Sequence, residues 1–333
     1  MRVLIIRCGA LGDLVYATSV IDALRLQYGE HTIIDFVSTP GSGMLFKDDP
    51  RINEVFPLKH KKIPILLSSQ KKAIIKASKK EPYDILINFE FGKQFKKLVY
   101  AIKAHKKVGS FFDLKEIPLD IVHMVEITKF FYQDLVSKEV FAKSFPRVIG
   151  SAPSKMKEKY MLPKKYIIIS PSNSHQKRNI LNYRAWENSS WIELIQKLSK
   201  DIQVVIIGNK NEDDFFNKLR PYPSNVIDLV AKTSLSDLIG IIEGATALVA
   251  TDTGTAHLSS AVNTSVFALI GPTPAKQTGP YSSPFNEVHI ITSNQECAPC
   301  YKTAVMKACK NNICMKEISV YMVFDSIKSA NIL

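Results

Sequence analysis

Long hydrophobic runs are missing from this 333-residue sequence. A membrane-spanning helix needs about 20 consecutive apolar residues, and no stretch approaches that length, so an integral membrane protein is not expected. A secretory signal is not expected either. Only four apolar residues, Val3–Ile6, stand between Arg2 and Arg7, and Gly12-Asp13 follow soon after. These features predict a cytoplasmic protein.

Acidic residues are scarce relative to basic ones. The chain has 44 Lys and Arg against 31 Asp and Glu, which leaves a net charge of +13. This excess suits an anionic partner such as a nucleotide, a phosphorylated lipid surface or nucleic acid. It is strongest between Lys59 and Lys107, where fourteen lysines meet three acids. The stretch is either a solubilising surface or a face for an anionic membrane. Nucleic acid is disfavoured because no binding motif accompanies the lysines.

Cysteine is rare, and four of the five cysteines crowd into residues 297–314. In a reducing compartment such clustering favours a metal site or free thiols over disulfides. Cys297 and Cys300 have good chelating spacing, whereas Cys309 and Cys314 are farther apart. These four cysteines form either a structural zinc or iron site or a group of free thiols. The fifth, Cys8, is interpreted as a small packing residue.

Short apolar runs alternate with helical patterns, which is typical of parallel α/β sheets. Two such series are separated by segment 151–165, whose Ser, Pro and Lys content indicates a linker. The predicted strands are Val3–Ile6, Ile33–Val37, Ile85–Phe89, Tyr166–Ser170, Gln203–Ile207, Val226–Asp228, Ala247–Ala250 and Val266–Ile270. The predicted helices are 14–28, 66–80, 93–107, 120–137, 186–199, 212–219, 234–243 and 254–262. Ligands of open α/β sheets sit outside the carboxyl ends of the strands, so two such domains imply a cleft between them.

The first candidate site is Gly9-Ala10-Leu11-Gly12-Asp13, soon after the first strand. Its glycines are three residues apart and no third one follows, so the dinucleotide fingerprint G-x-G-x-x-G is absent. This disfavours a hydride-transfer enzyme. Asp13 either caps the helix that begins here or is directed at a substrate.

A second candidate lies where the strand before Thr251 gives way to a helix. Free backbone N–H groups at such a helix start can bind an anion, and Gly254 lets a diphosphate approach the backbone closely. The alternative is a plain strand-to-helix turn with an acidic N-cap. The candidate residues are Asp252, Thr253, Gly254, Thr255, Ala256 and His257.

Two other loops carry cations after strand ends. Lys177 and Arg178 follow one turn, and Lys276 and Thr278 lie in the loop 271–281, which three prolines and two glycines make rigid. Their side chains are suited to donate hydrogen bonds to phosphate oxygens. A basic pair on a surface is usually only solvated. For Lys177 and Arg178, a role in phosphate binding is favoured only by their position after a strand end.

Taken in order, these motifs resemble glycosyltransferase family 9, the lipopolysaccharide heptosyltransferase family. The resemblance rests on GALGD at 9–13, Lys177-Arg178, TDTGTAH at 251–257 and GPTPAKQTGPY at 271–281. It extends through LVAKTSLSDL at 229–238 to the cysteine-rich tail. It departs where Asn179-Ile180 follow the basic pair, because family members commonly have an aromatic residue or proline there.

The resemblance implies an α/β protein with the GT-B fold, in which two Rossmann-like domains face a central cleft. The implied acceptor-binding domain covers 1–155, the nucleotide-sugar-binding domain covers 165–315, and a C-terminal helix in 316–333 returns toward the first domain. The implied reaction is an inverting, metal-independent transfer of heptose from ADP-heptose to the lipopolysaccharide inner core (Kdo-lipid A or a heptosyl acceptor). It implies an enzyme bound peripherally to the cytoplasmic face of the bacterial inner membrane, with no cofactor needed for catalysis.

The resemblance also assigns roles. The family's first-loop acid is the favoured general base, here Asp13, and Gly9, Ala10, Leu11 and Gly12 form the loop that the acceptor approaches. Rival readings are a relative that uses another nucleotide sugar or another acceptor, such as a protein or a different glycan, and a nucleotide-sugar-binding protein without turnover. The implied donor contacts are Lys177, Arg178, Asn209, Glu212, Thr278 and residues 252–257.

Overall fold

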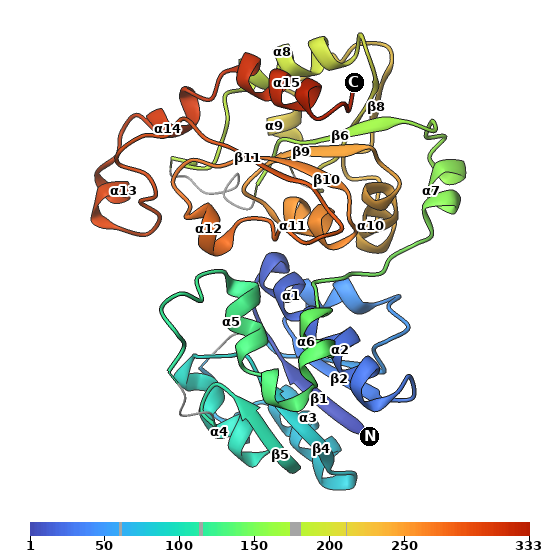
Figure 1. Ribbon diagram of the computed structural model, residues 1–333, viewed down its shortest axis with the longest axis vertical. Helices are drawn as coiled ribbons and strands as arrows, with labels where there is room; N and C mark the ends of the chain where they lie inside the picture. Colours follow the sequence, from blue (N-terminus) through green and yellow to red (C-terminus); the bar gives the residue numbers. More distant parts are fainter. Residues whose placement is uncertain (60–61, 113–115, 174–180, 211) are drawn as a thin grey trace. The chain divides into compact units, whose positions relative to one another are not determined.

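The computed structural model describes residues 1–59, 62–112, 116–173, 181–210 and 212–333 (Figure 1). The chain divides into two compact units, Met1–Ile149 and Gly150–Leu333. Segment 151–165, which we predicted as a linker, lies in the second unit and contains helix α7 (Pro153–Lys159). Within the described residues, every helix is too short or too polar to cross a membrane.

The first unit is built on a five-stranded parallel sheet with the order β3-β2-β1-β4-β5. Its central strand has the sequence RVLII, and four of these five residues are buried. A parallel strand covered on both faces needs such a continuous apolar run, which explains why this strand was predictable. The strands are β1 (Arg2–Ile6), β2 (Ile33–Ser38), β3 (Glu54–Pro57), β4 (Tyr83–Asn88) and β5 (Ala104–Gly109). The helices are α1 (Leu11–Ala17), α2 (Ser19–Tyr28), η1 (Ser42–Phe46), η2 (Ile65–Leu67), α3 (Ser69–Lys80), α4 (Lys93–Ala101), α5 (Met124–Phe130), η3 (Gln133–Leu135) and α6 (Lys138–Ala142).

Three helix predictions in this unit were partly wrong. The helix expected over 93–107 ends at Ala101, and the residues after it form the strand β5. This strand is at the sheet edge and keeps polar residues exposed, so its sequence lacks the apolar run of a central strand. The helix expected over 14–28 is divided into α1 and α2 at Thr18. The one expected over 120–137 is shortened to α5 and η3.

The second unit contains a six-stranded parallel sheet with the order β11-β10-β9-β6-β7-β8. The strands are β6 (Tyr166–Ser170), β7 (Gln203–Ile206), β8 (Val226–Asp228), β9 (Ala247–Thr251), β10 (Ser265–Leu269) and β11 (Val288–Ile291). The helices after α7 are α8 (Asn188–Leu198), α9 (Asp213–Phe216), α10 (Leu235–Glu243), α11 (Gly254–Ala261), α12 (Ala275–Thr278), α13 (Ala304–Ala308), α14 (Ile313–Lys316) and α15 (Val320–Ser329). The edge strand β11 is a further element that the sequence did not predict.

Two tryptophans anchor one face of the second sheet. Figure 1 shows α8 and α15 on one side of this sheet and α10 and α11 on the other. Trp186 and Trp191 pack edge to face with ring centroids 4.8 Å apart, and the indole N–H of Trp186 donates to the carbonyl oxygen of Ile318 at 2.7 Å. The C-terminal segment 316–333 is part of the second unit, where α15 contacts α8, and its expected return toward the first domain stays a prediction.

Candidate functional site

The loop after β1 places Asp13 in the first turn of α1. Its Oδ2 accepts a hydrogen bond from the backbone N–H of Ala10 at 2.9 Å, and its Oδ1 accepts one from Nη2 of Arg7 at 2.6 Å. A Cβ on Gly9 would lie 2.3 Å from the Cβ of Asp13, so a larger residue does not fit there without a shift. One oxygen of Asp13 therefore caps the helix start and the other is held by a guanidinium, while its direction at a substrate stays a prediction.

Glu90, just beyond the end of β4, completes this group. Its Oε1 accepts from the backbone N–H of Cys8 at 2.7 Å and lies 3.9 Å from Nη1 of Arg7. Because β4 pairs with β1 in the sheet, the segments beyond these two strands adjoin. Arg7 therefore stands between two carboxylates. A hollow of about 400 Å³ is lined by Arg7, Cys8, Gly9, Ala10, Asp13, Thr39 and Glu90.

Cys8 does not contribute a nucleophile to this hollow. Its side chain is 4% exposed, and burial, followed by the charge of Glu90, raises the pKa of the thiol far above its usual range. A thiol needs to be ionised to attack, so this one is inert at neutral pH. The interpretation of Cys8 as a packing residue is confirmed.

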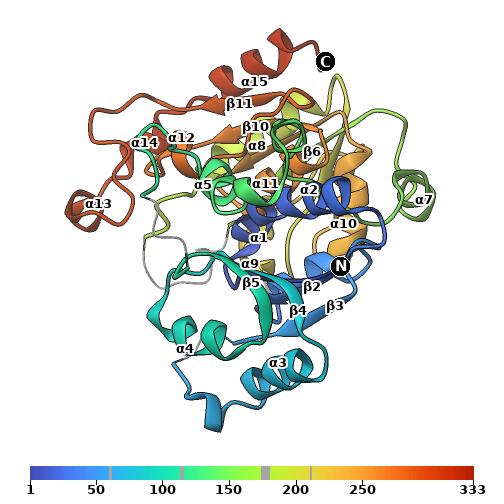
Figure 2. The same cartoon turned by 60° about the horizontal axis from the view of Figure 1, so that its bottom comes forward.

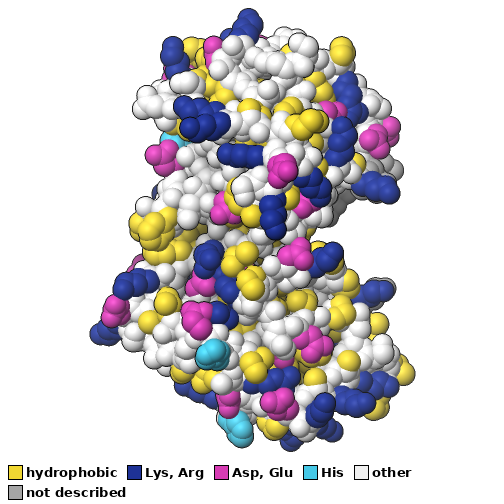
Figure 3. All heavy atoms as spheres, turned by 90° about the vertical axis from the view of Figure 1, so that its right-hand side faces the viewer, with side chains coloured by type: hydrophobic (Ala, Val, Ile, Leu, Met, Phe, Trp, Pro, Cys, Tyr) yellow, Lys and Arg dark blue, Asp and Glu magenta, His cyan; other side chains and the backbone are white. Residues whose placement is uncertain are grey.

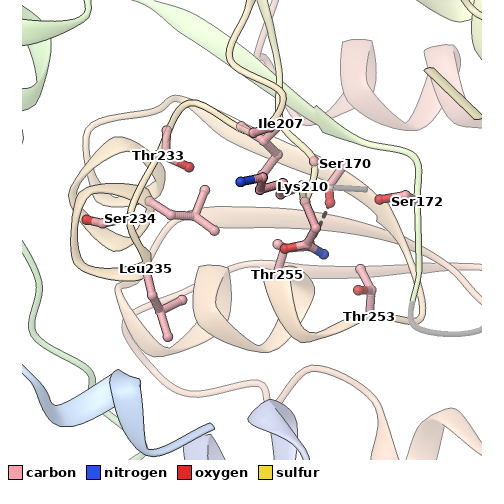
Figure 4. A pocket seen from close by; sticks show the side chains of 13 residues that line it. Ser170, Ser172, Ile207, Lys210, Thr233, Ser234, Leu235, Thr253 and Thr255 are labelled. Atoms are coloured by element: carbon pink, nitrogen blue, oxygen red, sulfur yellow. Dashed lines mark hydrogen bonds between the residues drawn. The ribbon is translucent and has the colours of Figure 1, made fainter. Parts of the chain in front are cut away.

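The second unit carries a cavity of about 370 Å³ beyond the carboxyl ends of β6 and β7 (Figure 4). In the view of Figure 4, Thr233, Ser234 and Leu235 line one side, and Thr253 and Thr255 line another. This placement agrees with the rule that open parallel sheets bind ligands at the carboxyl ends of their strands. The lining residues are Ser170, Ser172, Ile207, Gly208, Asn209, Lys210, Ala231, Thr233, Ser234, Leu235, Leu238, Thr253 and Thr255.

Hydrogen bonds fix the polar wall of this cavity. Glu212 is 6% exposed, and its Oε2 accepts from the hydroxyl of Ser172 at 2.8 Å and from the backbone N–H of Asn209 at 3.0 Å. The hydroxyls of Ser170 and Thr255 lie 2.8 Å apart and join the end of β6 to the first turn of α11. The wall therefore presents hydroxyl and amide groups in fixed positions, as a polar ligand requires.

Arg184 is a functional candidate that sequence reasoning missed. Its Nε lies 3.2 Å from Oδ2 of Asp252, and its guanidinium lies 4.5 Å from the centroid of the Tyr301 ring. Both ion-pair atoms are buried, and within the described residues neither completes a geometrically good hydrogen bond, so the charge of each is balanced mainly by the other. The sequence signal was the position of Arg184, two residues before the buried Trp186 that fixes this segment.

The structure distributes the other predicted donor residues unevenly. Asn209, Thr253 and Thr255 line the cavity, and Glu212 supports its wall. Thr278 ends α12, where its hydroxyl donates to the carbonyl oxygen of Pro274 at 3.4 Å. Lys177 and Arg178 lie outside the described residues. The remaining four predicted residues belong to the β9–α11 connection and α11 but do not line the cavity: Asp252, Gly254, Ala256 and His257.

The four clustered cysteines are free thiols. Cys297 is exposed, whereas Cys300 and Cys314 are buried. Burial, and then the neighbouring thiols, raise the pKa of Cys314 to about 11, which shows that the cluster is close in space. No group of three or more His, Cys, Asp or Glu in the described ranges is arranged to hold a metal ion. The zinc or iron site at these cysteines therefore stays a prediction.

Comparison with known protein sequences shows which family this chain belongs to. The model of glycosyltransferase family 9 (heptosyltransferase) matches residues 75–310. The chain is 23% identical to Escherichia coli lipopolysaccharide heptosyltransferase 3 over 79% of this chain and 81% of that protein. It is 25% identical to Campylobacter coli lipopolysaccharide heptosyltransferase 1 over 83% of this chain and 85% of that protein.

Solved structures show the same fold. A family 9 glycosyltransferase from Veillonella parvula matches with a TM-score of 0.79 at 17% identity, over 98% of this chain and 96% of that one. E. coli ADP-heptose lipopolysaccharide heptosyltransferase II matches with a TM-score of 0.76 at 18% identity, over 99% and 98%. An E. coli heptosyltransferase solved with ADP matches with a TM-score of 0.71 at 18% identity, over 99% of each chain. The predicted α/β class and GT-B fold are confirmed.

Proposed function

Because the chain belongs to glycosyltransferase family 9, the heptosyltransferase family, we propose that it transfers heptose from ADP-heptose to the lipopolysaccharide inner core. The relatives named as lipopolysaccharide heptosyltransferases support both the donor and the acceptor, and the relative solved with ADP supports the nucleotide. In this proposal the second unit binds the donor and the first unit binds the acceptor. The enzyme works at the cytoplasmic face of the inner membrane.

The observation that carries the proposal is the Asp13 carboxylate, held by Arg7 at a polar hollow. In an inverting transfer an acceptor hydroxyl attacks the anomeric carbon, the new C–O bond forms as the bond to the diphosphate breaks, and a base takes the hydroxyl proton. The side chain of Asp13 is 35% exposed, so an acceptor can reach it. Arg7 fixes the direction of the carboxylate.

The departing ADP needs its negative charge neutralised. Arg184 and the N-terminal amides of α11, which begins at Gly254, are the described groups suited to this role. Asp252 is then placed between the cation and the donor sugar. With side-chain and amide donors in these positions, we propose that transfer requires no metal.

The test is ADP release from ADP-heptose in the presence of a heptose-deficient Kdo-lipid A acceptor and a chelator. The wild type is measured beside Asp13→Asn and the control Asp48→Asn, whose carboxylate is exposed in the same unit. We expect turnover that survives chelation, is unchanged in the control and falls by about 10²- to 10⁴-fold in Asp13→Asn. Stabilisation by ADP should be retained in Asp13→Asn.

Three outcomes would contradict parts of the proposal. Loss of turnover with the chelator would show that a metal takes part. Binding of ADP-heptose without any turnover would remove the acceptor assignment and favour another acceptor or a binding protein. Stabilisation by a different nucleotide sugar, with no effect of ADP-heptose, would remove the donor assignment.

A further inference from the structure

A pair of leucines protrudes from the first unit just before α3. Leu66 and Leu67 lie in the short helix η2, and their exposed fractions are 82% and 77%. Ile63, three residues earlier, is also exposed. Single exposed apolar residues are normal, and on the face in Figure 3 they are mostly scattered among charged side chains. Adjacent leucines this exposed at one projecting turn indicate a surface that contacts something apolar.

The leucines are held in place by the helix that follows them. Ser68 caps α3 by accepting from the backbone N–H of Lys71 at 3.2 Å. The ammonium of Lys71 turns back and donates to the carbonyl oxygen of Ile63 at 2.7 Å. Lys71 is only 5% exposed, so its side chain stabilises the turn and is not solvated like the other lysines of α3. The leucine pair is therefore presented by an ordered turn.

The two helices that follow the leucines in sequence carry charge of one sign. Helices α3 and α4 contact each other and lie side by side in Figure 2. Neither SQKKAIIKASKK nor KQFKKLVYA contains an acid. Glu81, which directly follows α3, has its carboxylate 3.7 Å from the guanidinium of Arg2. A merely solvated helix face usually mixes both signs. The exposed lysines on the two helices are Lys72, Lys76, Lys79, Lys80, Lys93, Lys96 and Lys97.

We propose that η2, α3 and α4 form the surface by which this protein docks on an anionic lipid bilayer. Leu66 and Leu67 enter the headgroup boundary, and the lysines of α3 and α4 lie against the negative headgroups. Apolar anchors beside cations suit a lipid surface, whereas no nucleic-acid-binding motif accompanies these lysines. The inference rests on the proposed function, since it names the surface through which the enzyme meets a membrane-embedded acceptor.

The test is co-sedimentation of the full chain with vesicles, which needs neither donor nor acceptor. We expect binding to vesicles with equal amounts of phosphatidylcholine and phosphatidylglycerol, and little binding to phosphatidylcholine alone. Leu66→Ser/Leu67→Ser should weaken binding about tenfold or more. The matched control is Leu26→Ser/Met161→Ser, which removes two exposed apolar side chains elsewhere and should bind like the wild type.

A second pair of variants tests the charge. Lys72→Gln/Lys76→Gln/Lys79→Gln should lose vesicle binding and its salt dependence, whereas removing three exposed lysines of the second unit should change little. That control is Lys200→Gln/Lys218→Gln/Lys328→Gln. In a separate readout, a tryptophan at position 67 (Leu67→Trp) should shift its emission to the blue when anionic vesicles are added.

The proposal is overturned if the leucine variant binds vesicles like the wild type, or if both control variants lose binding as much as the variants of the surface. An unshifted emission at position 67 also counts against it. Tighter binding to an oligonucleotide than to vesicles, lost in the same lysine variant, would assign the surface to nucleic acid. Turnover on a lipid-free core saccharide should be the same in all variants. If the wild type shows no turnover on the Kdo-lipid A acceptor while vesicle binding persists, the proposed function fails and the docking surface stands.

Discussion

Replacing Asp237 with Asn should destabilise the second unit, and more at neutral pH than at acidic pH. Oδ2 of Asp237 accepts from the ammonium of Lys159 at 2.8 Å and from the hydroxyl of Tyr160 at 2.9 Å. Oδ1 accepts from the hydroxyl of Ser151 at 3.0 Å. These bonds join the α7 region to the first turn of α10, which also contributes to the wall of the second unit's cavity. An amide in place of the carboxylate would direct an N–H group at one of these donors.

The size of the effect follows from the pKa. Burial on its own would raise the pKa of Asp237, but the hydrogen bonds from Lys159, Tyr160 and Ser151 outweigh it and lower this pKa from 3.8 to about 2. The full shift corresponds to about 2 kcal/mol of stability. Because the Lys159 side chain is 55% exposed, solvent screens the pair, and we expect about 1 kcal/mol from ionisation of Asp237. The folded pKa is below the unfolded one, so this contribution is complete above about pH 5 and is lost as the pH falls toward 2.

The assay is urea unfolding followed by far-ultraviolet circular dichroism at about pH 7 and about pH 3. The matched control is Asp201→Asn, which removes an exposed carboxylate from the same unit. Asp237→Asn should lower the free energy of unfolding relative to this control at pH 7, by a smaller amount at pH 3. An equal loss at both pH values would show that the charge of Asp237 is not what stabilises the α7–α10 contact, and the reasoning above would be refuted.

Three other changes give distinct readouts. Arg184→Gln should weaken ADP about tenfold while leaving adenosine affinity unchanged in calorimetry, because in the proposed function this cation neutralises the diphosphate; an equal loss for both ligands would contradict this. Trp186→Ala should cost about 3–5 kcal/mol of unfolding free energy in denaturant titrations, because it removes a buried ring and its hydrogen bond to Ile318; a loss below 1 kcal/mol would be unexpected. Cys297 should react with a thiol reagent in the native protein before the buried Cys314; protection of Cys297, with one zinc or iron per chain in elemental analysis, would instead support the predicted metal site.

The central strands were predictable because both faces of a parallel sheet are covered. β1, β4, β6, β9 and β10 are continuous apolar runs, and the sequence located each of them to within one or two residues. Three of the four edge strands, β3, β5 and β11, were not predicted, whereas the fourth, β8, was. Their sequences, EVFP, AHKKVG and VHII, are short or half polar because one side of an edge strand has no neighbouring strand. What decides these strands is pairing with a distant segment, which local pattern does not contain.

The same reason separates the site residues that were found from those that were missed. Asp13 lies in the first turn of the helix after β1 and Asn209 lies in the loop after β7, and a sequence pattern is visible at both places. Glu90 and Arg184 act through partners distant in sequence. Glu90 meets the first loop because β4 is the neighbour of β1, and Arg184 meets Asp252 across 68 residues. Strand order, once known, would have predicted the contact of Glu90 with the first loop. The contact of Arg184 with Asp252 depends on how Trp186 fixes its segment.

Arg184 also connects the proposed donor site to the cysteine-rich tail. Its guanidinium lies over the ring of Tyr301, which follows Cys300, and the hydroxyl of the adjacent Tyr183 donates to the carbonyl oxygen of Cys309 at 3.3 Å. The loop that carries the thiols therefore supports the cation assigned to the diphosphate. This gives the tail a structural reason to be ordered whether or not its thiols bind a metal. A change in the thiol loop should then affect donor affinity through Arg184, even though none of the four cysteines lines the cavity.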